Sequence, residues 1–247
     1  MPHFTDRHGR QLNPISPIFP ILTGDKTNNG FKFLGTGFFV NTFGGFLTAK
    51  HVLYDIDGNH INPFFAITTH DEKQYVRYLH KSFPHPTADI CFGVLRRDAH
   101  LGDEYINIDF QTPIMQLLEN EPKPGDTIQT FAYPNSKFEY ENNEQWGTFQ
   151  GDWFNGKILD ILPYRDKTFY PYQIIESNMT VLGGASGGPV MQNAYVIGVN
   201  SSGVDFGDTG ESVSYITPIK FAHEIDIELN GEKFKLGNKK IQTFKEI

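Results

Sequence analysis

The sequence has almost no cysteine, since Cys91 is the only one in 247 residues. One thiol cannot form a disulfide within the chain, whereas turn-rich secreted proteins are often cross-linked by several. The scarcity therefore favours a reducing compartment, and we expect the protein to be cytoplasmic. Long apolar runs are also lacking, which argues against a membrane partner. The run at 14–22, PISPIFPIL, is broken by three prolines and lacks a convincing signal-peptide cleavage site.

Positive charge is scarce as well. The chain has 29 acidic and 21 basic residues and a formal net charge of -8. Binding to phosphate backbones calls for a basic surface, so a nucleic-acid partner is not expected. The stretch 231–247 departs from this balance with five lysines and two glutamates. We interpret it as a solvated amphipathic end rather than a docking tail.

Helical patterns are rare, and short runs with a period of two predominate between glycine and proline turns. The best helix candidate is 217–229, where Thr217 can cap the helix and Pro218 fits its first turn. The pattern predicts an all-β fold, a barrel or a sandwich, that ends in a C-terminal helix.

The segment 111–126 has no clear period and is the most probable break between two halves of similar size. We therefore expect domains at 1–115 and 116–247. The segment 135–157 looks like the longest irregular loop of the chain, and loops of this length are usually functional or mobile.

The stretch VLGGASGGPV, at 181–190, places four glycines around Ser186. A serine hydroxyl is a poor nucleophile until an oriented base removes its proton, and the oxyanion that forms needs N–H donors. Glycines let the backbone adopt the uncommon dihedral angles that aim such donors into a site. Gly184 and Ser186 are the natural donors here. Taken alone, the motif is equally compatible with an ordinary glycine turn.

Two further residues strengthen the catalytic interpretation. His51 ends the apolar strand of LTAKHV, and Asp89 stands before the buried strand of ADICFGVL. A lone histidine is commonly a surface residue, and an aspartate before a strand is commonly a turn former. Together with Ser186 they give the order His, Asp, Ser, each at the end of a strand.

With these residues the sequence resembles the chymotrypsin-like (trypsin-fold) serine peptidases, and among them the disulfide-free bacterial members related to the HtrA and glutamyl endopeptidase groups. The resembling stretches are GTGFFV…GFLTAKHV, ADICFGVL, GDTIQTFAYP, GGASGGPV and VIGVNSSG, which extend from about residue 33 to 220. The resemblance implies two six-stranded β-barrels with the active site between them. It also implies an endopeptidase that needs no cofactor or metal and acts on protein or peptide substrates through an acyl-enzyme.

The resemblance assigns a role to each residue. His51 would act as general base toward Ser186, and Asp89 would orient the imidazole. The N–H groups of Gly184 and Ser186 would form the oxyanion hole. Residues 201–203 (Ser201, Ser202 and Gly203) would pair with the substrate backbone by β-strand addition.

Ala185 departs from the family pattern, in which an acid beside the serine pairs with a newly cut N-terminus. Alanine cannot form this ion pair, so we do not expect activation by N-terminal cleavage. Either the oxyanion loop is competent as folded, or another element orders it. The segment 135–157 and an activating partner protein are the two candidates.

The resemblance also places the base of the primary specificity pocket at Thr180, with Val181 beside it and Asn200 and Ser201 on a wall. Because no carboxylate stands at the base, a preference for Arg or Lys before the scissile bond is not expected. Asp205 and Asp208 follow in the next loop and could enter the pocket.

Three other interpretations are less well supported. An α/β-hydrolase elbow around Ser186, with His223 as base, would need a helix after the serine, where Pro189 and a strand follow. A zinc enzyme built on His80, His85 and a carboxylate would lack a recognisable ligand motif. A protease-like barrel that binds peptides without cutting them is the third alternative.

Overall fold

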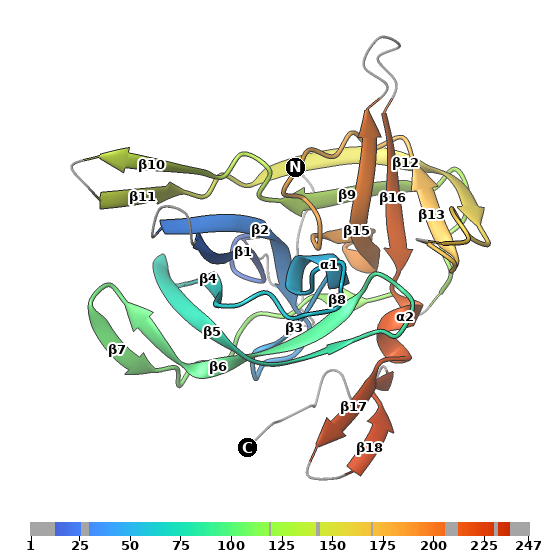
Figure 1. The fold of residues 1–247 in the computed structure, drawn as a ribbon. Coiled ribbons are helices and arrows are strands. Elements are labelled where there is room, and N and C mark those ends of the chain that lie inside the picture. Colours follow the sequence, from blue (N-terminus) through green and yellow to red (C-terminus); the bar gives the residue numbers. More distant parts are fainter. Residues whose placement is uncertain are drawn as a thin grey trace.

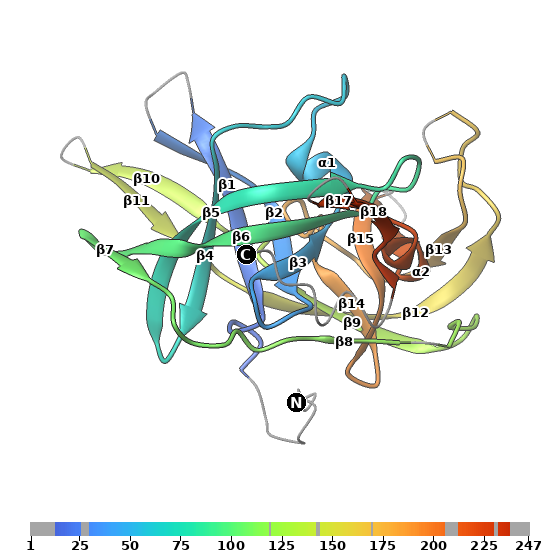
Figure 2. The same cartoon turned by 90° about the horizontal axis from the view of Figure 1, so that it is seen from below.

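The computed structural model describes residues 13–25, 30–118, 120–141, 144–168, 170–205, 212–229 and 232–237. Over these ranges the chain folds into two closed antiparallel β-barrels of six strands each (Figures 1 and 2). The two barrels expected from the sequence are therefore confirmed. Burial alternates with a period of two at 64–68 and 75–78, whereas the strand at 45–48 is buried throughout.

The first barrel has the strand order β3-β2-β1-β4-β5-β6, and pairing of β3 with β6 closes it. Its core is aromatic, with Phe19, Phe38 and Phe46 fully buried. The thiol of Cys91 is also fully buried. The strands are β1 (Ile18–Asp25), β2 (Gly30–Phe39), β3 (Gly45–Thr48), β4 (Phe64–His70), β5 (Lys73–Pro84) and β6 (Cys91–Leu101), and β7 (Glu104–Asn107) extends the sheet beyond β6.

The second barrel has the order β14-β9-β12-β13-β16-β15 and closes through β14 and β15. Aliphatic residues such as Ile128, Ile175 and Ile216 fill its interior. The strands are β9 (Thr127–Ala132), β12 (Asp152–Leu162), β13 (Ile174–Ser177), β14 (Pro189–Gln192), β15 (Tyr195–Asp205) and β16 (Ser212–Pro218), and the short β8 (Gln116–Leu117) pairs parallel with β15.

The segment 135–157 differs from the irregular loop expected of it. It forms a hairpin of β10 (Lys137–Glu141) and β11 (Glu144–Thr148) and then enters β12. Figure 1 shows this hairpin reaching out from the second barrel beside β2. The ring of Phe138 packs edge-on against Phe149, at 6.0 Å between centroids, so aromatic contacts support the hairpin.

The predicted C-terminal helix is mostly wrong. Only α2 (Lys220–His223) is helical, and a hairpin of β17 (Asp226–Leu229) and β18 (Glu232–Lys235) follows it. Ile225 and Ile227 are both fully buried, so the apolar pattern after α2 has a period of two. Lys233 and Lys235 pair with Glu228 and Asp226 across this hairpin, at 3.2 and 2.9 Å. Most of the basic stretch 231–247 lies outside the described residues.

The other helix, α1 (Lys50–Leu53), follows β3 and lies between the two barrels in Figures 1 and 2. Neither helix in the described ranges is long and apolar enough to cross a membrane.

Thr36 of β2 joins the two barrels. Its N–H donates to the carbonyl of Ser186 at 2.8 Å, and its hydroxyl donates to the carbonyl of Gly184 at 3.1 Å. The same hydroxyl accepts the N–H of Tyr133 at 3.3 Å, and the carbonyl of Thr36 accepts the hydroxyl of Thr48 at 2.8 Å. One buried residue thus holds the glycine-rich loop of the second barrel against the first.

Gly187 lies at the tightest point of this junction. Its φ is +86°, and an added Cβ would lie 2.1 Å from Thr48 Oγ1 and 2.2 Å from the carbonyl oxygen of Thr36. Both the left-handed conformation and the close approach require glycine. Gly183 has open space around its Cβ position and a φ outside the left-handed region.

We expect Gly187→Ala to lower the free energy of unfolding by at least about 3 kcal/mol, because it adds both backbone strain and overlap. The matched change Gly183→Ala should stay within about 0.5 kcal/mol of the wild type. Denaturant unfolding of the three proteins measures this difference. Equal stability of the two variants would contradict the description of the junction.

Candidate active site

His51 lies on α1, immediately after β3. Val52 and Leu53 are buried and anchor this single helical turn, whereas the side chain of His51 is 47% exposed. The helical turn α1 therefore places the imidazole at the surface between the barrels, just beyond the strand end at which LTAKHV predicted it.

Asp89 occupies the turn between β5 and β6, and a buried histidine shapes this turn. Nδ1 of His85 accepts the N–H of Ala88 at 2.8 Å and that of Thr87 at 3.2 Å. Burial lowers the pKa of His85, which keeps Nδ1 unprotonated and able to accept both bonds. His85 is thus a positioning residue for Asp89 that sequence reasoning missed.

The carboxylate of Asp89 accepts two hydrogen bonds from His51. Its Oδ1 accepts the backbone N–H of His51 at 3.0 Å, and its Oδ2 accepts the ring Nδ1–H at 2.9 Å. Because the carboxylate only accepts, the second bond places the proton on Nδ1 and leaves Nε2 as a free base.

Desolvation by the surrounding protein lowers the pKa of His51, but the hydrogen bond and charge of Asp89 outweigh this effect. The net result is a pKa raised above the ordinary value of 6.5. The ring is therefore a stronger base than an isolated histidine, while its partner carboxylate stabilises the protonated form.

The loop that carries Ser186 contains a tight turn. The N–H of Ala185 donates to the carbonyl of Leu182 at 3.2 Å, and Gly184 has a φ of +92° while Gly183 does not have a positive φ. This combination defines a type II turn, which fixes the orientation of the Gly183–Gly184 peptide. Within the described part of the chain, the N–H groups of Gly184 and Ser186 have no acceptor.

The two loops meet at the barrel junction. The Cβ position of Gly187 lies 3.1 Å from the N atom of Ala49, two residues before His51. Ser186 is half-buried at this point. The structure thus shows the backbones of the two loops close together and the His51–Asp89 pair formed. Among the described residues, no hydrogen bond joins the hydroxyl of Ser186 to the ring of His51.

A cleft of about 640 Å³ opens beside this pair and is lined by both barrels. The first barrel contributes His51, Asp89 and the loop that follows α1, where Ile56 is 93% exposed. The second contributes a set of hydroxyl-bearing residues, namely Tyr170, Tyr172, Ser201 and Ser202. A cleft of this size can hold part of an extended peptide beside His51.

Ser201 and Ser202 belong to the predicted substrate-binding set. Ser201 is buried, and its hydroxyl bonds to that of Thr217 at 2.6 Å. The hydroxyl of Ser202 accepts a bond from Arg165 at 3.0 Å. Gly203 is exposed, and its Cβ position lies 3.1 Å from the carbonyl oxygen of Val181, so these two segments run side by side.

The remaining predicted pocket residues differ in burial. Thr180 is exposed, whereas Asn200 is almost fully buried and donates to Thr130 Oγ1 at 2.9 Å. The hydroxyl of Thr130 donates to the carbonyl of Pro189, so it must accept from Asn200. This leaves Oδ1 of Asn200 buried without a donor among the described residues. The side chain of Asp205 and all of Asp208 lie outside the described residues.

Tyr172 was not predicted from the sequence. Its hydroxyl is near Thr217 at 3.4 Å, and it lines the cleft next to Asp89. Burial raises the pKa of Tyr172 well above its usual range, and the charge of Asp89 adds to this increase. The phenol therefore stays protonated beside the carboxylate.

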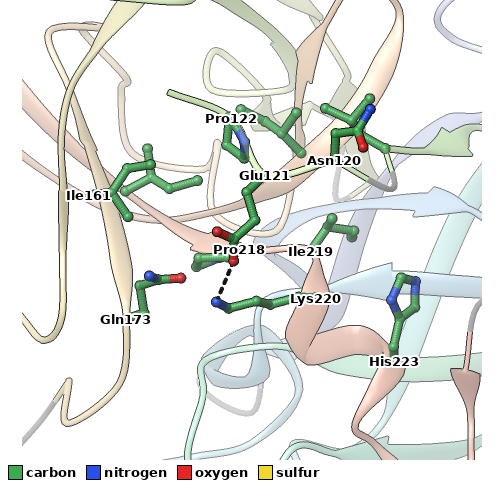
Figure 3. Close-up of a pocket in the computed structure, with 12 residues that line it drawn as sticks. Asn120, Glu121, Pro122, Ile161, Gln173, Pro218, Ile219, Lys220 and His223 are labelled. Carbon is green, nitrogen blue, oxygen red and sulfur yellow. Dashed lines mark hydrogen bonds and ion pairs between the residues drawn. The ribbon is translucent and has the colours of Figure 1, made fainter. Parts of the chain in front are cut away.

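A second pocket lies apart from the predicted site residues. Figure 3 shows it between α2, β16 and the segment before β9, with an ion pair of Lys220 and Glu121 at 2.9 Å. Its volume is only about 60 Å³, and it includes His223. The fold of two closed barrels excludes the α/β-hydrolase alternative that had used this histidine.

In the described ranges, no group of three or more histidine, cysteine or carboxylate side chains could hold a metal ion. His85 already uses Nδ1 to shape the Asp89 turn and places Nε2 3.7 Å from Glu224. The zinc-site hypothesis gains no support from this arrangement.

The fold of the chain is similar to that of many solved protein structures. Among solved structures, the Rv3671c protease from M. tuberculosis in its active form is 16% identical, with a TM-score of 0.54 over 85% of this chain and 81% of that one. The HtrA-type protease AlgW with a decapeptide is 16% identical, with a TM-score of 0.56 over 85% of this chain and 63% of AlgW. At this level of identity the likeness concerns the fold.

No curated protein matches the sequence. The family model described as Trypsin, however, matches residues 19–225, which include both barrels, His51, Asp89 and Ser186. The chain therefore belongs to the trypsin family of serine peptidases.

Proposed function

We propose that the protein is a serine endopeptidase that hydrolyses peptide bonds through an acyl-enzyme, with Ser186 as nucleophile, His51 as general base and Asp89 as its orienting carboxylate. The observation that carries this proposal is the pair of hydrogen bonds that His51 donates to Asp89, which leaves Nε2 free to act as a base. His51 and Asp89 both line the cleft. The approach of the Ser186 loop to the segment before α1 supports the same assignment.

In the proposed reaction, Nε2 of His51 takes the hydroxyl proton of Ser186 as the oxygen attacks the scissile carbonyl carbon. The imidazolium that forms is stabilised by Asp89, and it then protonates the leaving amine. Water hydrolyses the acyl-enzyme by the same proton transfers in reverse. General base catalysis of this kind contributes about 10²–10⁴ in rate.

The oxyanion would be bound by the N–H groups of Gly184 and Ser186. The type II turn supports this role, because the orientation of the Gly183–Gly184 peptide decides where the N–H of Gly184 points. In enzymes that stabilise a similar oxyanion, removing one such donor lowers kcat by about 10²–10³-fold.

Ala185 is buried and offers no carboxylate to a newly formed N-terminus. The loop is instead bonded to Thr36, and Gly184 packs against Phe33 and Pro134. These contacts support a loop that is competent as folded, so the proposal requires neither N-terminal trimming nor an activating partner protein.

The proposed substrate is an extended segment of a protein or peptide that pairs with residues 201–203. The buried, unpaired Cys91 is compatible with the reducing, cytoplasmic location expected from the sequence. The alternative is a peptide-binding module that does not cut, and a probe of the nucleophile separates the two.

We expect a fluorophosphonate probe to label the untrimmed chain and to fail on Ser186→Ala. Because His51 activates the serine, His51→Ala should reduce both labelling and turnover by several orders of magnitude. Ser16→Ala, which changes a serine outside the cleft, is the matched control and should be labelled like the wild type. Labelling of Ser186→Ala at the wild-type level would reject Ser186 as nucleophile, and labelling only after trimming would reject the competent loop.

The raised pKa of His51 sets the pH dependence. The base must be neutral to accept a proton, so activity should fall as the pH drops through the pKa of His51. We expect the acidic limb of kcat/KM to have its midpoint above pH 6.5, the ordinary value for histidine. Peptide hydrolysis measured between about pH 5 and pH 9 gives this midpoint. A midpoint below 6.5 would contradict the dominance of Asp89 over desolvation.

For the residue just before the scissile bond, we expect an uncharged side chain, small or hydrogen-bonding, rather than Arg or Lys. A buried cation without a carboxylate is strongly disfavoured, and the exposed Thr180 would offer its hydroxyl to a neutral side chain. Profiling of a peptide library tests this directly. If Thr180 forms the base, Thr180→Asp should raise cleavage after basic residues by about tenfold or more, whereas Thr148→Asp, on the exposed β11, should not.

A further inference from the structure

Arg165 lies on the loop between β12 and β13 and contacts two residues that line the cleft. Its Nη1 donates to the hydroxyl of Ser202 at 3.0 Å. Its guanidinium carbon lies 3.8 Å from the centre of the Tyr215 ring and 5.1 Å from that of Tyr170. Ser202 and Tyr170 both line the cleft that contains His51.

The loop holds this side chain in place. Asp166 and Tyr170 exchange two backbone hydrogen bonds, at 3.4 and 3.0 Å, and the N–H of Thr168 donates to Asp166 Oδ1 at 2.8 Å. The guanidinium itself is held by two aromatic rings and one hydroxyl. Such a cation loses little further freedom when it binds a ligand.

Arg165 has no opposite charge beside it. Among the side chains that the structure describes, no carboxylate lies within ion-pair distance of Arg165. One of its five N–H donors is used by Ser202, and the others are available to a further acceptor. A half-buried cation in this position is unusual for a chain with a net charge of -8, and it favours an anionic ligand.

The strand β15 determines which part of a substrate would meet Arg165. β14 pairs with β15 only as far as Pro189 and Val199, and the backbone of Asn200 still bonds to the loop before β14. This edge of β15 is therefore open from residue 201 onward within the described ranges. On the other edge Ser202 pairs with Tyr215. A substrate strand added at the open edge would place the residue opposite Ser202 on the same face as the Ser202 side chain.

We propose that Arg165, with Ser202 and Tyr215, forms a subsite for a carboxylate, which selects Asp or Glu at the second or fourth residue before the scissile bond. This inference rests on the proposed function and on pairing of the first residue before the bond opposite Ser201. Side chains two residues apart share one face of a strand, which gives the even positions.

The test uses the full chain and pairs of peptides that differ only by Glu or Gln at one of the four positions before the bond. A charge-assisted, bidentate contact should make kcat/KM about 10-fold to 100-fold higher for Glu than for Gln at the second or fourth position. This ratio should fall as the salt concentration rises. No such ratio is expected at the first or third position.

Arg165→Gln should reduce the Glu/Gln ratio to near one, and Arg165→Glu should reverse the preference toward Lys. Lys167→Gln is the matched control, because it removes a different cation from the same loop. The ammonium of Lys167 lies over the ring of Tyr164, 5.6 Å from its centre, so this variant should keep the wild-type ratio. Fluorophosphonate labelling of each variant verifies that its active site is formed.

The possible results separate the two hypotheses. A wild type that is neither labelled nor able to cut any peptide would reject the proposed function and the subsite with it. A labelled, active enzyme would reject the subsite alone if its Glu/Gln ratio is near one at both even positions, or if Arg165→Gln keeps the ratio. Loss of the wild-type ratio with increasing salt supports the subsite even where a variant does not fold.

Discussion

The hydrogen bonds of Thr36 connect the serine loop of the second barrel to β3, the strand that leads to His51. Its backbone and hydroxyl groups bond to two carbonyls of the serine loop, to β3 and to the end of β9. Only a hydroxyl can donate to Gly184 and accept from Tyr133 at one atom, so an apolar residue of the same shape cannot replace it. The contact fixes the serine loop from the side of the first barrel, and under the proposed function it would serve in place of the acid that Ala185 replaces.

The two barrels contribute different parts of the site. The first provides the proposed general base and its orienting carboxylate, and the buried ring of His85 accepts two backbone N–H groups of the turn that carries Asp89. The second provides the serine loop and the open edge of β15. Because each part is built on a closed barrel, the geometry depends on a few junction contacts.

The sequence predicted the barrels and the three proposed catalytic residues because these depend on local signals. Strand alternation, glycines and strand ends are all visible within about ten residues. His85 was missed because a histidine in HPTAD looks like part of a turn, and its bonds to Thr87 and Ala88 are backbone contacts. Arg165 could not be predicted, because Ser202 is 37 residues away along the chain. The prediction of a helix over 217–229 was wrong beyond the single turn of α2. The buried Ile225 and Ile227 are two residues apart, which is the spacing of a strand, and the chain enters β17 there.

The open edge of β15 also imposes a requirement on shape. A substrate backbone can pair with the free N–H and C=O groups of this edge only if it is extended and has its own groups free. A segment already hydrogen-bonded in a helix or an inner strand cannot make these contacts without unfolding first. The edge would therefore select substrates by backbone conformation as well as by side chain. Unfolded segments, chain ends and long loops could bind there, whereas the folded interiors of other proteins could not.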